Sequence, residues 1–172
     1  MTDPLSQYPF YPQMACNNSY GIPVYGDFMC NAMEATLPFC LRLIEQCYET
    51  DSRAACVNAT IFCNLFQVVP YKFVGVNPYD IRIPCEFPPL CYDFSNIDGY
   101  LDQRSVKVQL GAEGRRWKDC NYVVNFMFQL IGYDWMRTVA QDVVYLLDST
   151  NVRTLFYAGD ADLIVHHYGI EK

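Results

Sequence analysis

The residues of this chain with the most evident capacity for chemistry are two aspartates and its only two histidines, in the segment "LFYAGDADLIVHHYG". Asp160 and Asp162 precede His166 and His167, and both residue types bind metals or take part in acid-base chemistry. A metal site built from one loop without further histidines is uncommon. The spacing therefore favours a simpler arrangement, in which one aspartate caps a helix beginning near Leu163 and the histidines are partly exposed on its first turns.

A nucleophile to complete a catalytic set is not evident in the remaining sequence. None of the six serines lies in a G-x-S-x-G turn, which an activated serine of the hydrolase type requires. A cysteine nucleophile is also disfavoured, because eight of the nine cysteines can be paired. The chemistry near the C-terminus is therefore incomplete on its own.

Two helical segments, 31–49 and 52–67, are the first elements that could position such groups. Apolar residues recur in both at helical spacing, which predicts two amphipathic helices. Pro38 interrupts the first pattern, and a proline inside a helix removes a backbone hydrogen bond. We therefore expect the first helix to begin near Pro38.

Four cysteines predict how these helices pair. Cys40 and Cys47 are seven positions apart, as are Cys56 and Cys63, so each pair lies on one helix face about 10 Å apart along the axis. That separation is too long for a disulfide within a pair. The short connection makes the helices antiparallel, so the bridges are nested: Cys47 with Cys56, and Cys40 with Cys63.

The other cysteines leave one without a partner. Cys16 with Cys30, and Cys85 with Cys91, are plausible local loops. Because the number of cysteines is odd, Cys120 is either a free thiol or pairs with a cysteine outside this chain.

Composition excludes several classes of protein. The 172 residues, 52% of them hydrophobic, suffice for one globular domain. The net charge of −7, without a run of Lys or Arg, argues against nucleic-acid binding. No apolar run approaches the ~20 residues of a membrane span, and no targeting segment is evident. The disulfides indicate an oxidising compartment, and sequons at Asn17 and Asn58 agree with a secretory route.

The C-terminal third has a different pattern. Residues 136–149 predict a helix, and residues 152–159 predict a short buried strand that ends at Gly159. A helix followed by a strand and a polar loop is an α/β unit of the kind that carries functional groups at the strand's end. Such a unit needs neighbouring strands, and the earlier segments supply few.

Several segments, in order, resemble the serine carboxypeptidase family, most closely its fungal vacuolar group: "TDPLSQYPFY", "CLRLIEQCYE", "NPYDIRIPCE", "LCYDFSNIDGYL" and "YAGDADLIVHHYG". The resemblance covers nearly all of the chain. It implies a partial α/β-hydrolase fold with a helical, disulfide-bonded insertion. Residues 1–172 would be an internal part of one domain, with the insertion at approximately 14–95 and a return to the α/β core at approximately 96–172.

The resemblance also implies a catalytic role for one aspartate. The second aspartate of the family's G-D-x-D is the carboxylate of a Ser-Asp-His triad, which corresponds to Asp162. Asp160 would then be structural, and His166 and His167 would not be the base. The nucleophile would lie upstream of this chain and the catalytic histidine downstream, so the chain alone would be inactive. The implied reaction removes C-terminal residues of peptides through an acyl-enzyme, with no cofactor and no metal.

Further roles follow from the same resemblance. The pocket for the penultimate substrate residue would include Tyr8, Tyr11 and Trp135. The pocket for the leaving residue would include Tyr79 and Tyr92. Both would be bordered by Ile164 and Val165. The family's disulfides pair Cys16 with Cys30, Cys85 with Cys91, and Cys120 with a cysteine upstream of this chain.

Two other functions remain open from the sequence. The chain could be a secreted, disulfide-rich binding module without catalysis, or part of a carboxypeptidase-like acyltransferase. For the enzyme we expect peptide or protein C-termini as substrates, no nucleic-acid or membrane partner, and a vacuolar or extracellular location. The sequence does not indicate an oligomeric state.

Overall fold

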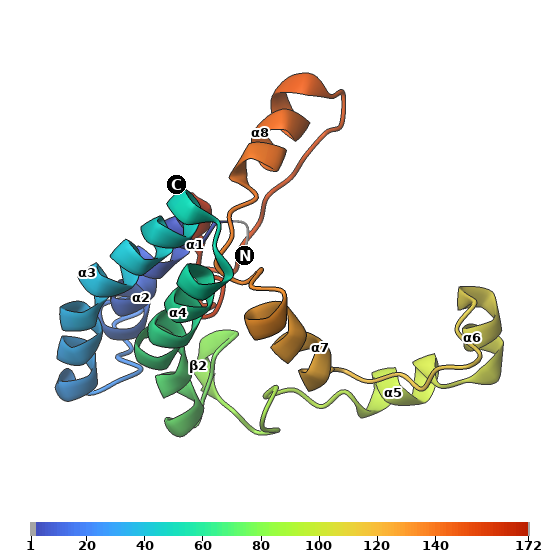
Figure 1. Cartoon of the computed structure of the whole chain (residues 1–172). Helices are drawn as coiled ribbons and strands as arrows, with labels where there is room; N and C mark the ends of the chain where they lie inside the picture. The colour runs from blue at the N-terminus through green and yellow to red at the C-terminus, as the bar shows by residue number, and fades with distance from the viewer. Residues whose placement is uncertain (1–2, 172) are drawn as a thin grey trace.

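The computed structural model describes residues 3–171, and helices dominate it (Figure 1). The N-terminal part contains α1 (Pro4–Gln7), a 3-10 turn (Tyr8–Phe10), α2 (Tyr11–Cys16), α3 (Asp27–Thr50) and α4 (Arg53–Cys63). A π-helical turn (Asn64–Val68) and a 3-10 turn (Val69–Phe73) extend α4. The later helices are α5 (Ser95–Leu101), α6 (Arg104–Leu110), α7 (Tyr122–Phe126) with the π-helical turn Met127–Ile131, α8 (Ala140–Ser149) and α9 (His167–Ile170).

The predicted disulfide hairpin is confirmed. Helices α3 and α4 are joined by a short turn, and Cys47–Cys56 and Cys40–Cys63 form the nested bridges. Ser52 caps α4, since its side chain accepts from the backbone N–H of Ala55. All four bridged cysteines of the hairpin are buried, so the bridges form part of the core.

The expectation that the first helix begins near Pro38 is wrong, because α3 begins at Asp27 and contains Pro38. Met33 and Ile44 lie on opposite sides of the proline, and both are fully buried. The Gln67 side chain also donates to the carbonyl oxygen of Met33, at 3.0 Å, in the turn before the proline. Packing on both sides of Pro38 thus outweighs the backbone hydrogen bond that it removes.

The helical run Arg53–Phe73 is long and apolar enough to cross a bilayer by length and composition alone. The sequence pattern did not indicate such a run. Two disulfides fasten it to α3, and residues such as Ala59 and Thr60 are buried. The core helix of a soluble protein passes the same test, so this finding carries no membrane assignment.

A two-stranded antiparallel hairpin is the only sheet within residues 3–171, formed by β1 (Val76–Asn77) and β2 (Asp80–Pro84). The predicted strand over residues 152–159 is wrong, since this segment is irregular, with Leu155 82% and Tyr157 87% exposed. A strand needs a neighbour to pair its N–H and C=O groups, and among the described residues 3–171 no strand pairs with this segment. The chain's own architecture is therefore mainly helical rather than α/β.

The molecule has a compact part and two extensions (Figure 1). Helix α8 with the segment after it projects in one direction, and α5 and α6 project in another beyond α7. Large apolar side chains are exposed on α7, α8 and the segment after α8, including Tyr122, Val123, Phe126, Val144, Tyr145, Leu147, Leu155 and Phe156. The helices here do not bury their apolar faces against each other.

The compact part brings the first and the last described helices of the chain together. Helix α9 packs against α1, and Tyr8, Tyr11 and Met136 are among the buried residues of the shared core. Gly169 permits this contact, because a Cβ there would lie 2.7 Å from the carbonyl oxygen of Ser6. The aspartate loop that precedes α9 is thereby held against the N-terminal segment.

Candidate functional site

The loop around Asp162 is ordered by its own carboxylate. Asp162 Oδ1 accepts the backbone N–H groups of Ile164, at 2.7 Å, and Val165, at 2.9 Å. This is an Asx-type turn, in which a side chain takes the place of a backbone acceptor. The expectation of a helix beginning near Leu163 is wrong, since α9 begins at His167 and is capped by His166.

The β hairpin holds this loop through backbone hydrogen bonds. The carbonyl oxygen of Pro78, in the turn between β1 and β2, accepts from the N–H groups of Leu163 (2.9 Å) and Ile164 (3.3 Å). In return, the N–H of Ile81 donates to the carbonyl oxygen of Ala161 at 3.0 Å. The segment "NPYDIRIPCE" therefore supports the aspartate loop directly.

The burial and the hydrogen bonds of the Asp162 carboxylate suit it to pair with a cationic side chain. Partial burial raises the pKa of its carboxyl group, and donation by the N–H groups of Val165 and Ile164 opposes that rise. Within residues 3–171, no hydrogen bond is made to Oδ2. A half-buried carboxylate with one oxygen fixed and the other unengaged can accept the Nδ1–H of an imidazole and stabilise its protonated form.

Asp160 has a different environment on the same loop. Its side chain is exposed, and a hydrogen bond from the Tyr20 hydroxyl lowers the pKa of its carboxyl group. Arg82 lies over the Tyr20 ring, 5.3 Å from the centroid, and pairs with Asp80 at 2.8 Å. Asp160 thus connects the loop to Tyr20 and, through the Tyr20 ring, to Arg82 of β2.

The histidines are less exposed than the sequence pattern predicts. His166 is fully buried, its Nδ1 accepts from the N–H of Gly169 at 3.3 Å, and its ring packs edge-on against Tyr11 at 5.0 Å. His167 is half-buried and lies 4.0 Å from the ring of Tyr168. The expectation of partly exposed histidines is thus wrong for His166, because the N-terminal aromatic residues cover it. Within the described part of the chain, no three His, Cys, Asp or Glu side chains are grouped to hold a metal ion.

His166 makes stability depend on pH. Burial lowers the pKa of its imidazole to about 4, and the nearby His167 contributes. An unfolded histidine has a pKa of about 6.5, so stability is fully present above that value and is lost as the pH falls towards 4. We expect a loss of about 2 kcal/mol between pH 7.5 and pH 5. His166→Asn keeps a capping side chain but cannot be protonated, so urea titrations should show that this loss disappears.

The matched control for this titration is His167→Asn on the neighbouring, half-buried histidine. It should retain most of the acid-dependent loss of the unsubstituted chain, because burial is the main cause of the lowered pKa of His166. An equal pH dependence in the His166→Asn protein and the unsubstituted chain would contradict the assignment.

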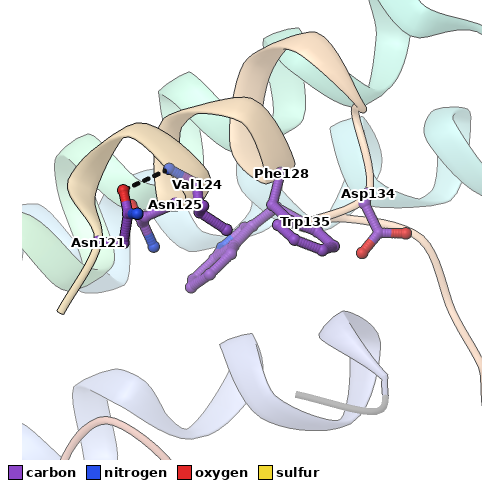
Figure 2. A pocket seen from close by; sticks show the side chains of 6 residues that line it. All are labelled: Asn121, Val124, Asn125, Phe128, Asp134 and Trp135. Atoms are coloured by element: carbon purple, nitrogen blue, oxygen red, sulfur yellow. Dashed lines mark hydrogen bonds between the residues drawn. The ribbon is translucent and has the colours of Figure 1, made fainter. Parts of the chain in front are cut away.

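An open pocket of about 400 Å³ lies beside Trp135, and we call it the Trp135 pocket. Figure 2 shows the Phe128 and Trp135 rings close together, with Asp134 beyond Trp135. Its six lining residues are Asn121, Val124, Asn125, Phe128, Asp134 and Trp135. Asn121 also caps α7, because its Oδ1 accepts the N–H groups of Val123 and Val124. Half of the lining is polar, and the apolar half consists of Phe128, Trp135 and Val124.

The structure connects Trp135 to two other predicted pocket residues. Trp135 Nε1 donates to the Tyr8 hydroxyl at 3.3 Å, and that hydroxyl donates to Asn64 Oδ1 at 2.6 Å. Tyr8 and Tyr11 pack edge-on at 5.2 Å, and their side chains are 0% and 1% exposed. Tyr8 therefore contacts Trp135 directly, and the rings of both tyrosines are covered by protein.

The second predicted pair of tyrosines is more exposed. The rings of Tyr79 and Tyr92 are 6.0 Å apart, and the residues are 39% and 42% exposed. Tyr79 directly follows Pro78, whose carbonyl oxygen accepts from the Asp162 loop, and burial with the charge of Asp162 raises the pKa of the Tyr79 hydroxyl. Ile164 and Val165 are half-buried on the aspartate loop.

The remaining predicted residues lie as follows. Cys16–Cys30 and Cys85–Cys91 are disulfides, with S–S distances of 2.06 and 2.00 Å. Cys120 is a free, half-buried cysteine. The two sequon asparagines, Asn17 and Asn58, are exposed.

Sequence patterns did not single out Pro78 or Tyr20 as partners of the aspartate loop, or Asn121 and Phe128 as walls of the Trp135 pocket. The contacts of Pro78 and Tyr20 join segments that are far apart in the sequence, so no local sequence pattern indicates them. Asn121 alone had one, since an asparagine before an apolar helical run is a typical helix cap.

Comparison with known proteins identifies the class. The model of the serine carboxypeptidase family matches residues 1–172, so the chain belongs to that family. It is 44% identical over 170 residues to "Carboxypeptidase Y homolog A" of Ajellomyces capsulatus, covering 98% of this chain and 31% of that protein. It is also 44% identical over 170 residues to "Carboxypeptidase Y" of Saccharomyces cerevisiae, covering 98% of this chain and 32% of that protein. The chain thus spans about a third of the length of these relatives.

Proposed function

We propose that this chain is the part of a longer serine carboxypeptidase that contributes the triad carboxylate, Asp162, and walls of the substrate pockets. The observation that carries the proposal is the Asp162 turn, in which Oδ1 is fixed by two backbone N–H groups and Oδ2 is unengaged among residues 3–171. Membership of the serine carboxypeptidase family supports the same role. The serine and the histidine of the triad would lie outside these 172 residues.

The proposed reaction divides the work between this chain and the rest of the enzyme. The histidine takes the serine proton as the serine oxygen attacks the carbonyl carbon of the last peptide bond, and then gives that proton to the leaving amine. Asp162 accepts the histidine Nδ1–H throughout and stabilises the imidazolium. Water then releases the acyl group by the same steps in reverse order, and neither metal nor cofactor takes part.

The pockets of this chain indicate the substrates. The Trp135 pocket would accept an apolar penultimate side chain against its aromatic residues, Phe128 and Trp135. Tyr79 and Tyr92, near the Asp162 loop, would flank the leaving residue. Peptide and protein C-termini are therefore the proposed substrates, and the relatives named "Carboxypeptidase Y" support that class.

The proposed whole protein has an α/β-hydrolase fold, with its helical insertion at approximately 14–95 and its core resumed at approximately 96–172. Apolar faces on α7, α8 and the segment 152–159 would then be covered by the rest of the core. Four disulfides and two exposed sequons, at Asn17 and Asn58, support a secretory route to a vacuole or to the outside. Cys120 would pair with a cysteine of the remaining chain.

The test is hydrolysis of a blocked dipeptide with apolar residues, which the longer protein should cleave and the 172-residue chain should not. Release of the free C-terminal amino acid, followed by chromatography, measures the activity. Adding an alcohol acceptor separates hydrolysis from acyl transfer. Cleavage by the 172-residue chain itself, or its absence in the correctly folded longer protein, would refute the proposal.

A further inference from the structure

We propose that Tyr11 is a positioning residue for Asp162. The Tyr11 hydroxyl binds the Ile164–Val165 peptide unit, and that peptide unit in turn fixes the Asp162 carboxylate. This inference rests on the proposed function, because it concerns the same aspartate. It differs from a role for Tyr11 as a wall of the substrate pocket.

The argument begins with one hydrogen bond between distant segments. The Tyr11 hydroxyl donates to the carbonyl oxygen of Ile164 at 2.8 Å, across 153 positions of sequence. That carbonyl belongs to the peptide unit between Ile164 and Val165, whose N–H donates to Asp162 Oδ1 at 2.9 Å. Because a peptide unit is planar and trans, its C=O and N–H point in opposite directions. Tyr11 and Asp162 therefore form hydrogen bonds to opposite ends of the same planar peptide unit.

The two bonds support each other. A carbonyl that accepts a hydrogen bond polarises its peptide unit, and this strengthens donation by the N–H at the other end. The other N–H that binds Asp162 Oδ1, from Ile164, is directed by Pro78 as well. Without the tyrosine, the Ile164–Val165 peptide could tilt, and the Asp162 carboxylate would lose its fixed orientation.

Tyr11 itself has little freedom to move. Its side chain is 1% exposed, and it packs edge-on against His166 at 5.0 Å and Tyr8 at 5.2 Å. Burial also raises the pKa of its hydroxyl well above the ordinary value, so the group remains a donor throughout the acid and neutral range. A donor that is buried, protonated and packed on two sides is suited to positioning.

The experiment compares Tyr11→Phe with Tyr8→Phe. Both remove one buried hydroxyl, but the Tyr8 hydroxyl contacts Asn64 and Trp135 and makes no bond to the aspartate loop. In the 172-residue chain, Tyr11→Phe should speed hydrogen exchange of the Val165 amide by about tenfold, as expected for one lost hydrogen bond. Tyr8→Phe should leave that amide within about twofold of the unsubstituted chain.

Kinetics of the longer protein supply the second readout. Tyr11→Phe should lower kcat by about tenfold, equally for substrates with phenylalanine or alanine as the penultimate residue, and leave KM within about twofold. A pocket wall would instead raise KM for the larger side chain. Replacing Tyr11 with 4-aminophenylalanine restores a donor of similar shape and should recover both kcat and the slow exchange.

The outcomes separate the two proposals. Unchanged exchange at Val165, or equal acceleration in Tyr8→Phe, overturns the positioning role whatever the enzyme does. A KM effect that depends on the substrate side chain, without a kcat effect, also overturns it. A longer protein that cleaves no peptide refutes the proposed function, and the exchange data still decide whether Tyr11 holds the loop.

Discussion

Asp162→Asn in the longer protein is expected to lower kcat by about four orders of magnitude, with little change in stability. The asparagine side-chain oxygen can still accept the N–H groups of Ile164 and Val165, so the turn is retained. The negative charge that stabilises the imidazolium is lost, and an amide that presents its N–H₂ favours the wrong histidine tautomer. Single-turnover acylation with a chromogenic blocked dipeptide measures the effect directly.

Asp160→Asn is the matched control on the same loop. Asp160 is exposed and bonded to Tyr20, so kcat should fall by no more than about threefold. Thermal unfolding of both variants establishes that each remains folded. Comparable losses in the two variants, or retained activity in Asp162→Asn, would be incompatible with a triad role for Asp162.

The disulfide hairpin was predictable because its information is local. The heptad spacing of the cysteines and the short connection restrict the geometry to one nested pairing, and α3 and α4 carry it. Pro38 misled the prediction of the helix start, since the rule for proline describes an isolated helix. Burial of Met33 and Ile44 on either side decides the outcome in the folded chain.

The strand predicted at 152–159 illustrates the opposite case. Its apolar composition favours a buried strand, but composition cannot supply the neighbour that pairs with it. Within residues 3–171 the only paired strands are β1 and β2. The exposed Leu155 and Tyr157 thus mark a segment whose structure depends on contacts outside its own sequence.

The candidate site was predictable only in part. The pattern G-D-x-D and the family resemblance single out Asp162, but its supports come from Pro78 and Tyr11, far away in sequence. Burial of His166 has the same origin, because Tyr11 covers it. The local pattern predicted a helix cap where the structure has an Asx-type turn, and the long-range contacts that orient this turn emerge only from the folded chain.

Removal of the Cys47–Cys56 disulfide is expected to lower the free energy of unfolding by about 3 kcal/mol. It should also make the Trp135 side chain more mobile. The bridge closes a loop with a sequence separation of 9, so its loss frees the unfolded chain. Cys47 Sγ also lies 3.6 Å from the carbonyl oxygen of Met136, a fully buried residue that follows Trp135. Cys47→Ala with Cys56→Ala therefore removes a contact to the residue next to Trp135 in the sequence. Urea unfolding measures the stability, and tryptophan emission in a Trp117→Phe background reports on Trp135.

Cys40→Ala with Cys63→Ala is the control for this double substitution. That bridge spans a sequence separation of 23 in the same hairpin, so its loss also costs about 3 kcal/mol. The Cys47 contact with Met136 is retained, and Trp135 emission in the folded state should stay unchanged. A red shift confined to the Cys47–Cys56 variant links the hairpin to the pocket. Equal shifts in both variants would mean that the hairpin acts on Trp135 only through overall stability, and the local link would then be wrong.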